Sequence, residues 1–530
     1  MDSFQGGDLD LSTLIERRRA LGDADALRIG NQRYSYAELA TLVEQRVAIL
    51  ISAGVAAGEL VLCPTMPVLD SVLMQWALAR VGAAMLPVRT DLPHSRPESL
   101  IEASGAECWW QPADPDANTD ANNRPAGALI RSGSAHVPAT TSSAAATHSP
   151  PAPALLIETS GSSAEPKLVM LSAAAIIASC RAVNARLDLK PGDRWLCVLP
   201  RQHVGGLAIG YRCALAGAEL VVQVVQSRFE AEQVQTALWD ARITHLSLVP
   251  AMLERLLGVD PAPPPWLRVV LLGGQGLDSN LARRAVEQGW PLYLGYGMTE
   301  TFSQVAGGWI GADGLPQRGL MPLDGVELDC PSCDPIQHQA PSDAANVAPQ
   351  QAPSQASQQA QPLRIRGPML MLGYANPTRR PGAGLDNGWL ETSDLACRLP
   401  GGGIQILGRA DDVVLIAGIN VLPAEIEHEL AQLDQITEIA IIGVPDPTWG
   451  HRLVALYVGE LEPAQLEAWC RGNLPSHRRP RTFARLESLP TLSSGKPDRR
   501  ALIARAKALG ELKAEAAPAH RAFSGHRENH

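Results

Sequence analysis

Four short segments of the chain combine hydroxyl, carboxylate, lysine and glycine residues at spacings that suit a phosphorylated ligand. The first segment, 159–167 (TSGSSAEPK), follows the apolar run 154–157, which predicts a strand. Its small residues let backbone N–H groups and hydroxyls converge on an anion, and Lys167 adds a positive charge. It lacks the Gly-x4-Gly-Lys-Ser/Thr spacing of a Walker A loop. Taken alone, a segment of this kind is usually an ordinary Ser/Gly loop.

The second segment, 292–301 (LYLGYGMTET), carries three groups that suit a nucleotide. Tyr296 offers a flat face for a purine, and Thr299 offers a hydroxyl to a phosphate. Glu300 offers the hard oxygen ligand that Mg²⁺ prefers. The alternative is a glycine-containing turn with a core tyrosine and a surface glutamate.

The third and fourth segments add a carboxylate, a guanidinium and a second lysine. Asp394 ends the run 388–394, and Arg409 lies shortly after it in the sequence. A carboxylate can accept hydrogen bonds from both ribose hydroxyls, and an arginine can fork onto the same sugar or a phosphate. Lys496 lies on the glycine loop 492–499 (LSSGKPDR). The plainer alternatives are a surface ion-pair cluster at a turn and a solvated lysine.

The elements that must position these groups alternate between strands and helices. Residues 34–39 predict a strand that runs into a helix, with Ser35 as its N-cap. Residues 71–81 have apolar residues at helical spacing, and Gly82 follows where a C-cap glycine belongs. Short apolar runs such as 85–88 predict buried strands. This alternation indicates a parallel α/β sheet.

Two stretches are low in complexity, and we expect both to be flexible insertions. Residues 111–153 and 331–362 contain too few large apolar side chains to offset the entropy of ordering. The second stretch interrupts a predicted hairpin between 325–328 and 363–366. A helix–strand–helix pattern resumes at Pro423.

Composition excludes several classes of protein. The chain has 530 residues and a net charge of −10, which argues against nonspecific nucleic-acid binding. Its nine cysteines are scattered, and the close pair Cys330 and Cys333 has no partner at zinc spacing, so we expect free thiols. The N-terminus is polar and unlike a secretory signal, and the apolar stretch 60–88 is interrupted by proline and charge. We therefore expect no membrane span and a cytoplasmic protein.

Together and in this order, the four segments resemble the acyl-adenylate-forming (AMP-binding) superfamily, which includes acyl- and aryl-CoA ligases. The resemblance extends from about residue 11 to 507, and the segments 199–206 (LPRQHVGG), 271–276 (LLGGQG) and 365–374 (IRGPMLMLGY) support it. It implies an α/β fold whose large N-terminal domain has layered sheets and a small β-barrel-like part. A small, mobile α+β C-terminal domain would follow.

The resemblance also implies domain limits. The large domain would span 10–410, the C-terminal domain 411–507, and a flexible tail 508–530. Asp411 would be the hinge between the two domains.

The family's site residues map onto matching positions here. Thr299, Glu300 and His203 would take part in catalysis, Glu300 as the Mg²⁺ ligand, and Lys496 would be the catalytic lysine. Asp394 and Arg409 would bind the ribose. The remaining nucleotide contacts would be made by Thr159, Ser160, Gly161, Ser162, Ser163, Lys167, Gly274, Gln275, Gly276, Tyr296 and Gly297.

The sequence departs from the family pattern in two places. Ala164, followed by Glu165, stands where the phosphate loop usually has its second glycine. The segment after the hinge reads 416–420 (IAGIN), with Ile419 in place of the usual glutamate.

The resemblance implies an ATP-dependent acid–thiol ligase with ATP, Mg²⁺ and CoA as cofactors. It would activate a small carboxylic acid as acyl-AMP, release pyrophosphate and transfer the acyl group to CoA. The runs 214–218, 244–250 and 287–290 are most similar to o-succinylbenzoate–CoA ligases, which favours an aryl acid. His203 and Arg201 would then meet a second carboxylate, unless Arg201 faces solvent. Two alternatives stay open: loading of an acyl carrier protein, and a non-catalytic nucleotide-binding homologue.

Overall fold

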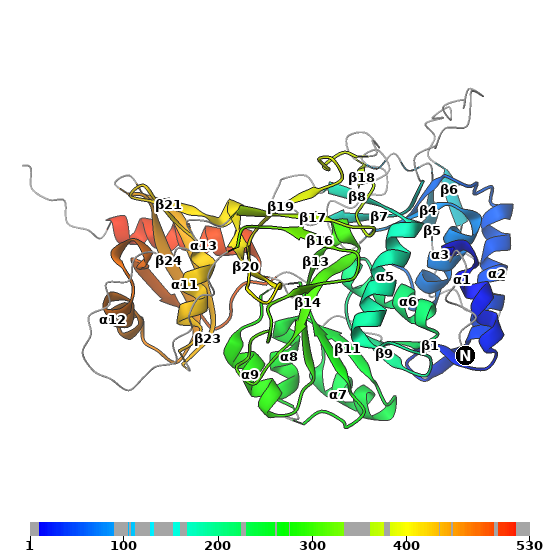
Figure 1. Cartoon of the computed structure of the whole chain (residues 1–530), viewed down its shortest axis with the longest axis horizontal. Helices are drawn as coiled ribbons and strands as arrows, with labels where there is room; N and C mark the ends of the chain where they lie inside the picture. The colour runs from blue at the N-terminus through cyan, green and yellow to red at the C-terminus, as the bar shows by residue number, and fades with distance from the viewer. Residues whose placement is uncertain are drawn as a thin grey trace, which may run out of the picture.

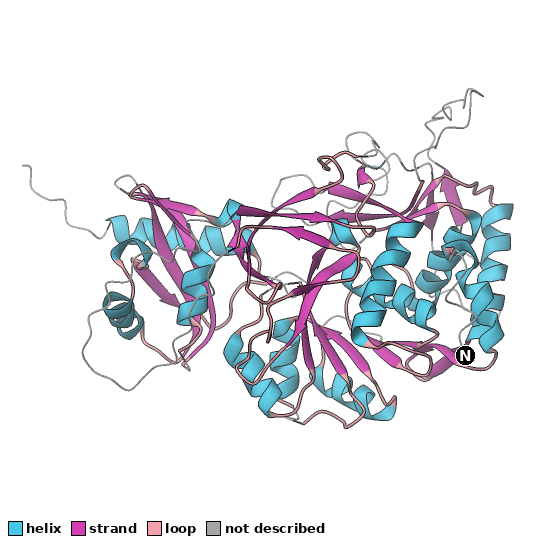
Figure 2. Ribbon diagram, viewed as in Figure 1, coloured by secondary structure: helices cyan, strands magenta, loops and turns pink. Residues whose placement is uncertain are grey.

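The fold consists of stacked α/β layers, a small antiparallel sheet and a separate C-terminal α+β unit (Figures 1 and 2). It is a computed structural model. The described residues are 10–88, 104, 106, 108–111, 128–131, 152–159, 167–223, 229–259, 262–274, 276–332, 361–375, 382–433, 435–446, 449–491 and 497–515. Among the described helices, none is long and apolar enough to cross a bilayer.

The first large sheet carries much of the site at one edge. Its inner strands β13, β12, β11, β9, β10 and β1 run parallel, as the alternating pattern predicts. In order across the sheet, its strands are β15 (Met321–Pro322), β14 (Ser303–Trp309), β13 (Leu292–Met298), β12 (Val269–Leu272), β11 (His245–Leu248), β9 (Arg194–Cys197), β10 (Glu219–Val222), β1 (Asp25–Ile29) and β2 (Gln32–Ser35).

The second large sheet combines a parallel centre with antiparallel edges. Strands β7, β4, β3 and β5 run parallel, whereas β8 and β6 pair antiparallel at the two sides. In order, its strands are β18 (Gly373–Tyr374), β8 (Lys167–Ser172), β7 (Pro153–Thr159), β4 (Ala84–Pro87), β3 (Leu60–Cys63), β5 (Cys108–Gln111) and β6 (Ala128–Arg131).

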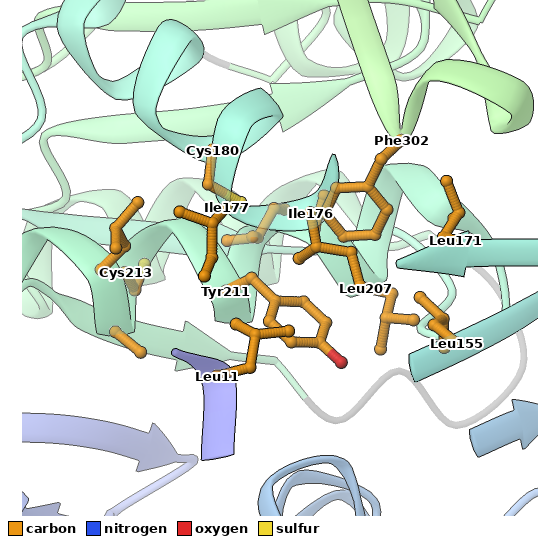
Figure 3. Packing of buried hydrophobic residues seen from close by; sticks show 14 of the residues in the cluster. Leu11, Leu155, Leu171, Ile176, Ile177, Cys180, Leu207, Tyr211, Cys213 and Phe302 are labelled. Carbon is orange, nitrogen blue, oxygen red and sulfur yellow. The ribbon is translucent and has the colours of Figure 1, made fainter. Parts of the chain in front are cut away.

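Helices α5 (Ala173–Leu187) and α6 (Val204–Ala216) lie between the two sheets and form the main core (Figures 1 and 3). Tyr211 of α6 packs edge-on against Phe302 with ring centroids 5.5 Å apart. Burial of these helices on both sides explains why their sequences are apolar nearly all round. Helices α1 (Leu11–Arg18), α2 (Tyr36–Ser52) and α3 (Val68–Val81) pack together at the N-terminal end (Figure 1).

The first sheet has a second hydrophobic core on its opposite face, because successive side chains of β9 point to opposite faces of the sheet. Trp195 and Cys197 face the main core, whereas Leu196 faces the second one. Three helices cover that second face: α7 (Ala231–Asp240), α8 (Pro250–Leu257) and α9 (Ser279–Glu287).

The antiparallel sheet contains the predicted hairpin. In β16 (Glu327–Asp329), Leu328 pairs with Ile365 of β17 (Gln361–Arg366), so the hairpin between 325–328 and 363–366 is confirmed. Strands β19 (Leu390–Arg398) and β20 (Ile404–Arg409) complete the sheet and bring Asp394 opposite Arg409.

The C-terminal unit has its own core around one three-stranded sheet. That sheet consists of β23 (Ile436–Asp446), β24 (Gly450–Gly459) and β25 (Thr482–Arg485). One face packs against α11 (Pro423–Leu430) and α12 (Pro463–Asn473), the other against α13 (Arg499–Glu515). The hairpin of β21 (Val414–Ile416) and β22 (Ile419–Val421) precedes it.

The predicted helix ends are confirmed. Ser35 caps α2 and forms a reciprocal capping box with Glu38. Gly82 ends α3 with a φ of 80°, the left-handed conformation that glycine adopts at little cost.

Three expectations need correction. Residues 128–131 form β6, so the stretch 111–153 is not a flexible insertion throughout, because Ile130 and its neighbours pair with β5. Helix α13 continues to Glu515, so the tail does not begin at 508. Cys397 is disulfide-bonded, so the expectation of free thiols throughout is wrong at that residue.

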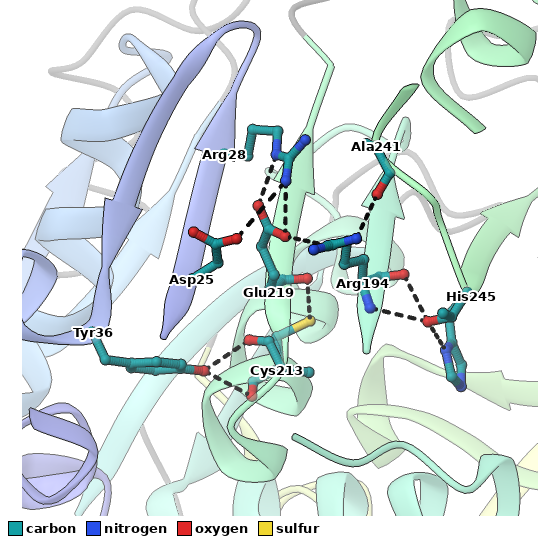
Figure 4. A network of polar contacts seen from close by, with 10 residues as sticks. Asp25, Arg28, Tyr36, Arg194, Cys213, Glu219, Ala241 and His245 are labelled. Carbon is teal, nitrogen blue, oxygen red and sulfur yellow. Dashed lines mark hydrogen bonds and ion pairs between the residues drawn. The ribbon is translucent and has the colours of Figure 1, made fainter. Parts of the chain in front are cut away.

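A buried ion-pair network joins the neighbouring strands β1, β10 and β9 of the first sheet (Figure 4). The Glu219 carboxylate is 2% exposed and accepts hydrogen bonds from Arg28 Nε at 2.8 Å and from Arg194 Nε at 2.8 Å. Removal of one partner from a buried ion pair leaves a desolvated charge without compensation.

We therefore expect Glu219→Gln to destabilise the protein by about 3 kcal/mol, seen as a fall of several degrees in the thermal unfolding midpoint. The matched control is Glu327→Gln, which breaks the exposed pair with Arg366 and should cost below about 1 kcal/mol. Equal midpoints for the two variants would contradict the prediction.

Candidate active site

A large cleft of about 2330 Å³ lies between the large unit and the C-terminal unit. Its lining includes Thr299 and Asp394 from the large unit and Glu427 and His428 from α11. Near α9 and α11 the two units are joined by hydrogen bonds, including one from Asn280 Nδ2 to the Ala431 carbonyl at 2.6 Å.

At one side of the cleft, three predicted nucleotide-binding residues contact one another. The Tyr296 hydroxyl donates to Asp394 Oδ2 at 2.6 Å, and Arg409 Nη1 lies 3.3 Å from Asp394 Oδ1. Burial and then the charge of Asp394 raise the pKa of Tyr296 well above its usual value, so the phenol remains a donor. The carboxylate still has lone pairs for further donors such as a pair of sugar hydroxyls.

The predicted hinge is tied to this group. Arg409 Nε donates to Asp411 Oδ1 at 2.9 Å, and Arg409 Nη2 donates to Asp411 Oδ2 at 3.0 Å. Burial alone would raise the pKa of Asp411, but the hydrogen bonds and charge of Arg409 outweigh burial and lower it. Asp412 pairs with Arg499 at the start of α13. Residues 409–412 therefore connect the Asp394 side of the cleft to the C-terminal unit.

A second contact group lies along another part of the cleft. The Tyr374 hydroxyl donates to Glu300 Oε1 at 2.9 Å, and Lys167 Nζ lies 4.9 Å from the centroid of the Tyr374 ring. Burial, followed by the Glu300 charge, raises the pKa of Tyr374 and keeps it protonated. The sequence predicted Lys167 and Glu300 as site residues but not Tyr374, which contacts both of them.

The turn that presents Glu300 is fixed by its neighbours. A Cβ atom at Gly297 would lie 1.7 Å from the Ser303 carbonyl oxygen, so no other residue fits there. The buried Thr301 hydroxyl bonds to the Met298 and Ser303 carbonyls at 3.0 and 2.7 Å. Phe302 has a φ of 47°, an unfavourable conformation for a bulky residue, held by this packing.

The structure brings most of the described candidates to the cleft. In addition to the residues above, Thr159, Gly274, Gly276 and Gly297 line it. His203 precedes α6 and accepts the Leu207 amide through its carbonyl, and the described lining includes Arg201 and Gln202 but not His203. The remaining predictions lie outside the described residues: Ser160, Gly161, Ser162, Ser163, Ala164, Glu165, Gln275 and Lys496.

Arg201 is buried, which excludes the alternative in which it faces solvent. It is 9% exposed, lines the cleft and donates from Nη2 to Gln75 Oε1 at 2.7 Å. Gln75 gave no functional signal in the sequence, because it lies in the apolar periodicity of α3.

The site suits Mg²⁺ that is held mainly by the phosphate oxygens of a bound nucleotide and only in part by the protein. Among the described residues there is no group of three or more His, Cys, Asp or Glu side chains that could hold a metal alone. Glu300 and Lys167 both contact Tyr374, and one carboxylate together with phosphate oxygens is the ligand set that Mg²⁺ commonly uses.

Comparison with known proteins identifies the family. Residues 15–375 match the model of the AMP-binding enzyme family, and residues 425–496 match that of the AMP-binding enzyme C-terminal domain. The chain belongs to the AMP-binding enzyme family. The relatives that the chain matches include acyl- and aryl-CoA ligases, and the chain is an enzyme of this adenylate-forming class.

Several characterised proteins resemble this AMP-binding enzyme. A feruloyl-CoA synthase from Amycolatopsis is 28% identical over 91% of this chain and 96% of its own. A 2-succinylbenzoate–CoA ligase from Listeria monocytogenes is 29% identical over 66% of this chain and 69% of its own. The o-succinylbenzoate CoA synthetase of Bacillus subtilis has the same fold, with a TM-score of 0.71, 23% identity and coverage of 92% and 97%. The family and fold expected from the sequence are therefore confirmed.

Glu427 gives this AMP-binding enzyme a pH-dependent stability. Burial raises the pKa of Glu427 to about 7, although the Ile441 amide bonds its carboxylate at 2.7 Å. Between pH 4.5 and 7 the folded state then binds more protons than the unfolded state, so this residue lowers stability as the pH rises.

We therefore expect Glu427→Gln to raise the unfolding midpoint at pH 8, by the equivalent of roughly 1–3 kcal/mol, and to leave it unchanged at pH 5. Glu429→Gln, on the same helix but 40% exposed, is the control and should give no gain at pH 8. Identical shifts of the Glu427 variant at both pH values would refute the expectation.

Proposed function

We propose that this enzyme activates an aryl carboxylic acid of the o-succinylbenzoate class as acyl-AMP and then transfers the acyl group to CoA. The observation that carries the proposal is the one continuous cleft in which Tyr296, Asp394 and Arg409 meet at one side and Lys167 and Glu300 at another. ATP, Mg²⁺ and CoA are its cofactors, and the family match and the relatives support their use.

The nucleotide would lie across these two groups of residues. Gly274, Gln275, Gly276, Tyr296 and Gly297 would contact adenine, while Asp394 and Arg409 would hold the ribose. Thr299 would contact the α-phosphate, and Glu300 would hold Mg²⁺, which neutralises phosphate charge. The remaining phosphate contacts would come from Thr159, Ser160, Gly161, Ser162, Ser163 and Lys167.

The first half-reaction joins two anions, and this sets what the residues must do. The substrate carboxylate oxygen attacks the α-phosphorus of ATP, the bond to the bridging oxygen breaks, and pyrophosphate leaves. Charge repulsion and the charge of the in-line transition state dominate the barrier, so positioned cations and N–H donors lower it. Lys167 and Lys496 would supply these cations.

The second half-reaction requires access for a thiol. The CoA sulfur attacks the acyl carbon and AMP leaves with its phosphate oxygen. Rotation of the C-terminal unit about Asp411 would withdraw Lys496 and open a path for the thiol. The ion pairs of Arg409 with Asp411 and of Asp412 with Arg499 are the contacts at this hinge.

ATP–pyrophosphate exchange across a panel of aryl and fatty acids tests the proposal. We expect exchange with o-succinylbenzoate or a related aryl acid, followed by thioester formation with free CoA. Thioester formation only with a holo-carrier protein would support the carrier-loading alternative. Absence of exchange with every acid would reject the proposal in favour of a non-catalytic nucleotide-binding protein.

A further inference from the structure

The segment 371–374 holds Glu300 at two points. The Met371 amide donates to the Glu300 carbonyl at 2.8 Å, and the Tyr374 hydroxyl donates to Glu300 Oε1 at 2.9 Å. Met371 is buried, so the backbone end of this contact lies in the core. No described residue donates a hydrogen bond to the second carboxylate oxygen, Oε2. One oxygen of Glu300 is therefore held by the protein, and the other is available to a ligand.

The pairing of β18 with β8 places the Tyr374 ring beside Lys167. Tyr374 lies opposite Val169 in this antiparallel pair, and Lys167 precedes Val169 by two residues on the same face of β8. Lys167 Nζ lies 4.9 Å from the centroid of the ring. A Cβ atom at Gly384 would lie 2.4 Å from Tyr374 Cε2, so the backbone of Gly384 packs closely against the ring and fixes its position.

Tyr374 lies between two opposite charges, and all three residues line the cleft. Among the described residues, neither Lys167 nor Glu300 has an ion-pair partner. Each instead contacts a neutral part of Tyr374, whose raised pKa keeps the hydroxyl protonated. A direct ion pair between Lys167 and Glu300 would have to break before Mg²⁺ and a phosphate could bind, and separating a partly buried pair opposes binding.

We propose that Tyr374 is a positioning residue that prevents Lys167 and Glu300 from pairing with each other, so that both charges remain available to Mg²⁺-bound triphosphate. This inference rests on the proposed function, which uses both charges but gives Tyr374 no role. The hydroxyl would orient Glu300 toward the metal, as hydrogen bonds to metal-ligating carboxylates commonly do. The ring would hold the Lys167 ammonium apart from the carboxylate. AMP, which lacks the β- and γ-phosphates, would bind without this arrangement.

Calorimetric titration with ATP at a series of Mg²⁺ concentrations tests the proposal, without an acid substrate so that no acyl-AMP forms. Tyr374→Phe removes the hydroxyl and keeps the ring, and the Mg²⁺ concentration for half-maximal ATP binding should rise by about 10-fold. Tyr374→Leu removes both and lets Lys167 and Glu300 pair, so this concentration should rise by about 100-fold. The affinity for AMP should be unchanged in both variants, which a general disturbance of the cleft would not allow.

A second tyrosine supplies matched controls. Tyr34 of β2 is half-buried, donates its hydroxyl to Gln32 Oε1 at 3.2 Å and is not among the residues that line the cleft. Tyr34→Phe and Tyr34→Leu should leave the binding of AMP and the Mg²⁺ dependence of ATP binding unchanged. Should Tyr374→Leu fail to fold, Tyr374→Met takes its place, because methionine fills irregular space without a ring or a hydroxyl.

The outcomes separate this inference from the proposed function. An unchanged Mg²⁺ dependence in both Tyr374 variants, or an equal loss of AMP and ATP binding, would overturn the positioning role and leave adenylation standing. Equal Mg²⁺ dependence in Tyr374→Phe and Tyr374→Leu would likewise overturn it, because the ring would then not keep the charges apart. Failure of the unmodified enzyme to bind ATP at any Mg²⁺ concentration would overturn the proposed function, and this inference with it.

Discussion

Replacement of Lys496 by alanine is expected to lower ATP–pyrophosphate exchange by about 100- to 1000-fold, close to abolition. Lys496 would bridge the substrate carboxylate and the α-phosphate, and no shorter side chain can supply that charge. Thr491 and Pro497, on either side of Lys496 in the sequence, form an antiparallel bridge and both line the cleft. The two described residues that flank the lysine segment in the sequence therefore lie at the site.

The second half-reaction supplies the decisive comparison. Since Lys496 would be withdrawn when the thiol attacks, thioester formation from supplied acyl-AMP and CoA should be largely retained in Lys496→Ala. Lys507→Ala, an exposed lysine on α13, is the control and should leave both half-reactions unchanged. Equal losses in the two half-reactions would argue against alternation of the C-terminal unit.

Asp394→Asn is expected to lower kcat/KM for ATP by about 100-fold, mainly through a higher KM. The variant keeps the shape of the side chain but removes the charge that would accept both ribose hydroxyls, and charge-assisted hydrogen bonds are the strong ones. It also weakens the contact with Arg409, whose Nη1 lies 3.3 Å from the carboxylate. Steady-state kinetics with ATP as the varied substrate measures the effect.

Tyr296→Phe serves as the comparison for Asp394→Asn. This variant removes only the hydroxyl that donates to Asp394 at 2.6 Å and keeps the flat ring. We expect about a 10-fold effect on kcat/KM for ATP, consistent with one hydrogen bond to a charged group. An equal or larger loss than in Asp394→Asn would show that the carboxylate does not itself contact the ribose.

Local signals in the sequence were sufficient for much of the fold. The N-cap at Ser35, the C-cap at Gly82 and the hairpin between 325–328 and 363–366 were all predicted. The two caps depend on residues that are read at the end of one helix. The strand β6 was missed because its four residues lie in a stretch poor in large apolar side chains. The extension of α13 to Glu515 was missed because its end is polar.

The candidate site was predicted only where a motif marks it. Tyr296, Glu300, Asp394 and Arg409 stand in recognisable segments, and the structure places them in one cleft. Tyr374 was not predicted as a site residue, although it ends the supporting segment 365–374. Nothing in the neighbouring sequence indicates that its hydroxyl reaches Glu300, 74 positions away.

By itself, the sequence determined the order of strands and helices, the family and the chemistry of the nucleotide side, because these follow from short-range patterns and motif order. Only the tertiary structure decided the environment of Arg201. Gln75, its hydrogen-bond partner, lies 126 positions away in the sequence. Gln75 on α3 and Arg201 both lie beside Gly210 of α6, and this packing encloses the charge of Arg201. Burial and charge compensation are properties of the assembled chain, and residue spacing along the sequence does not encode them.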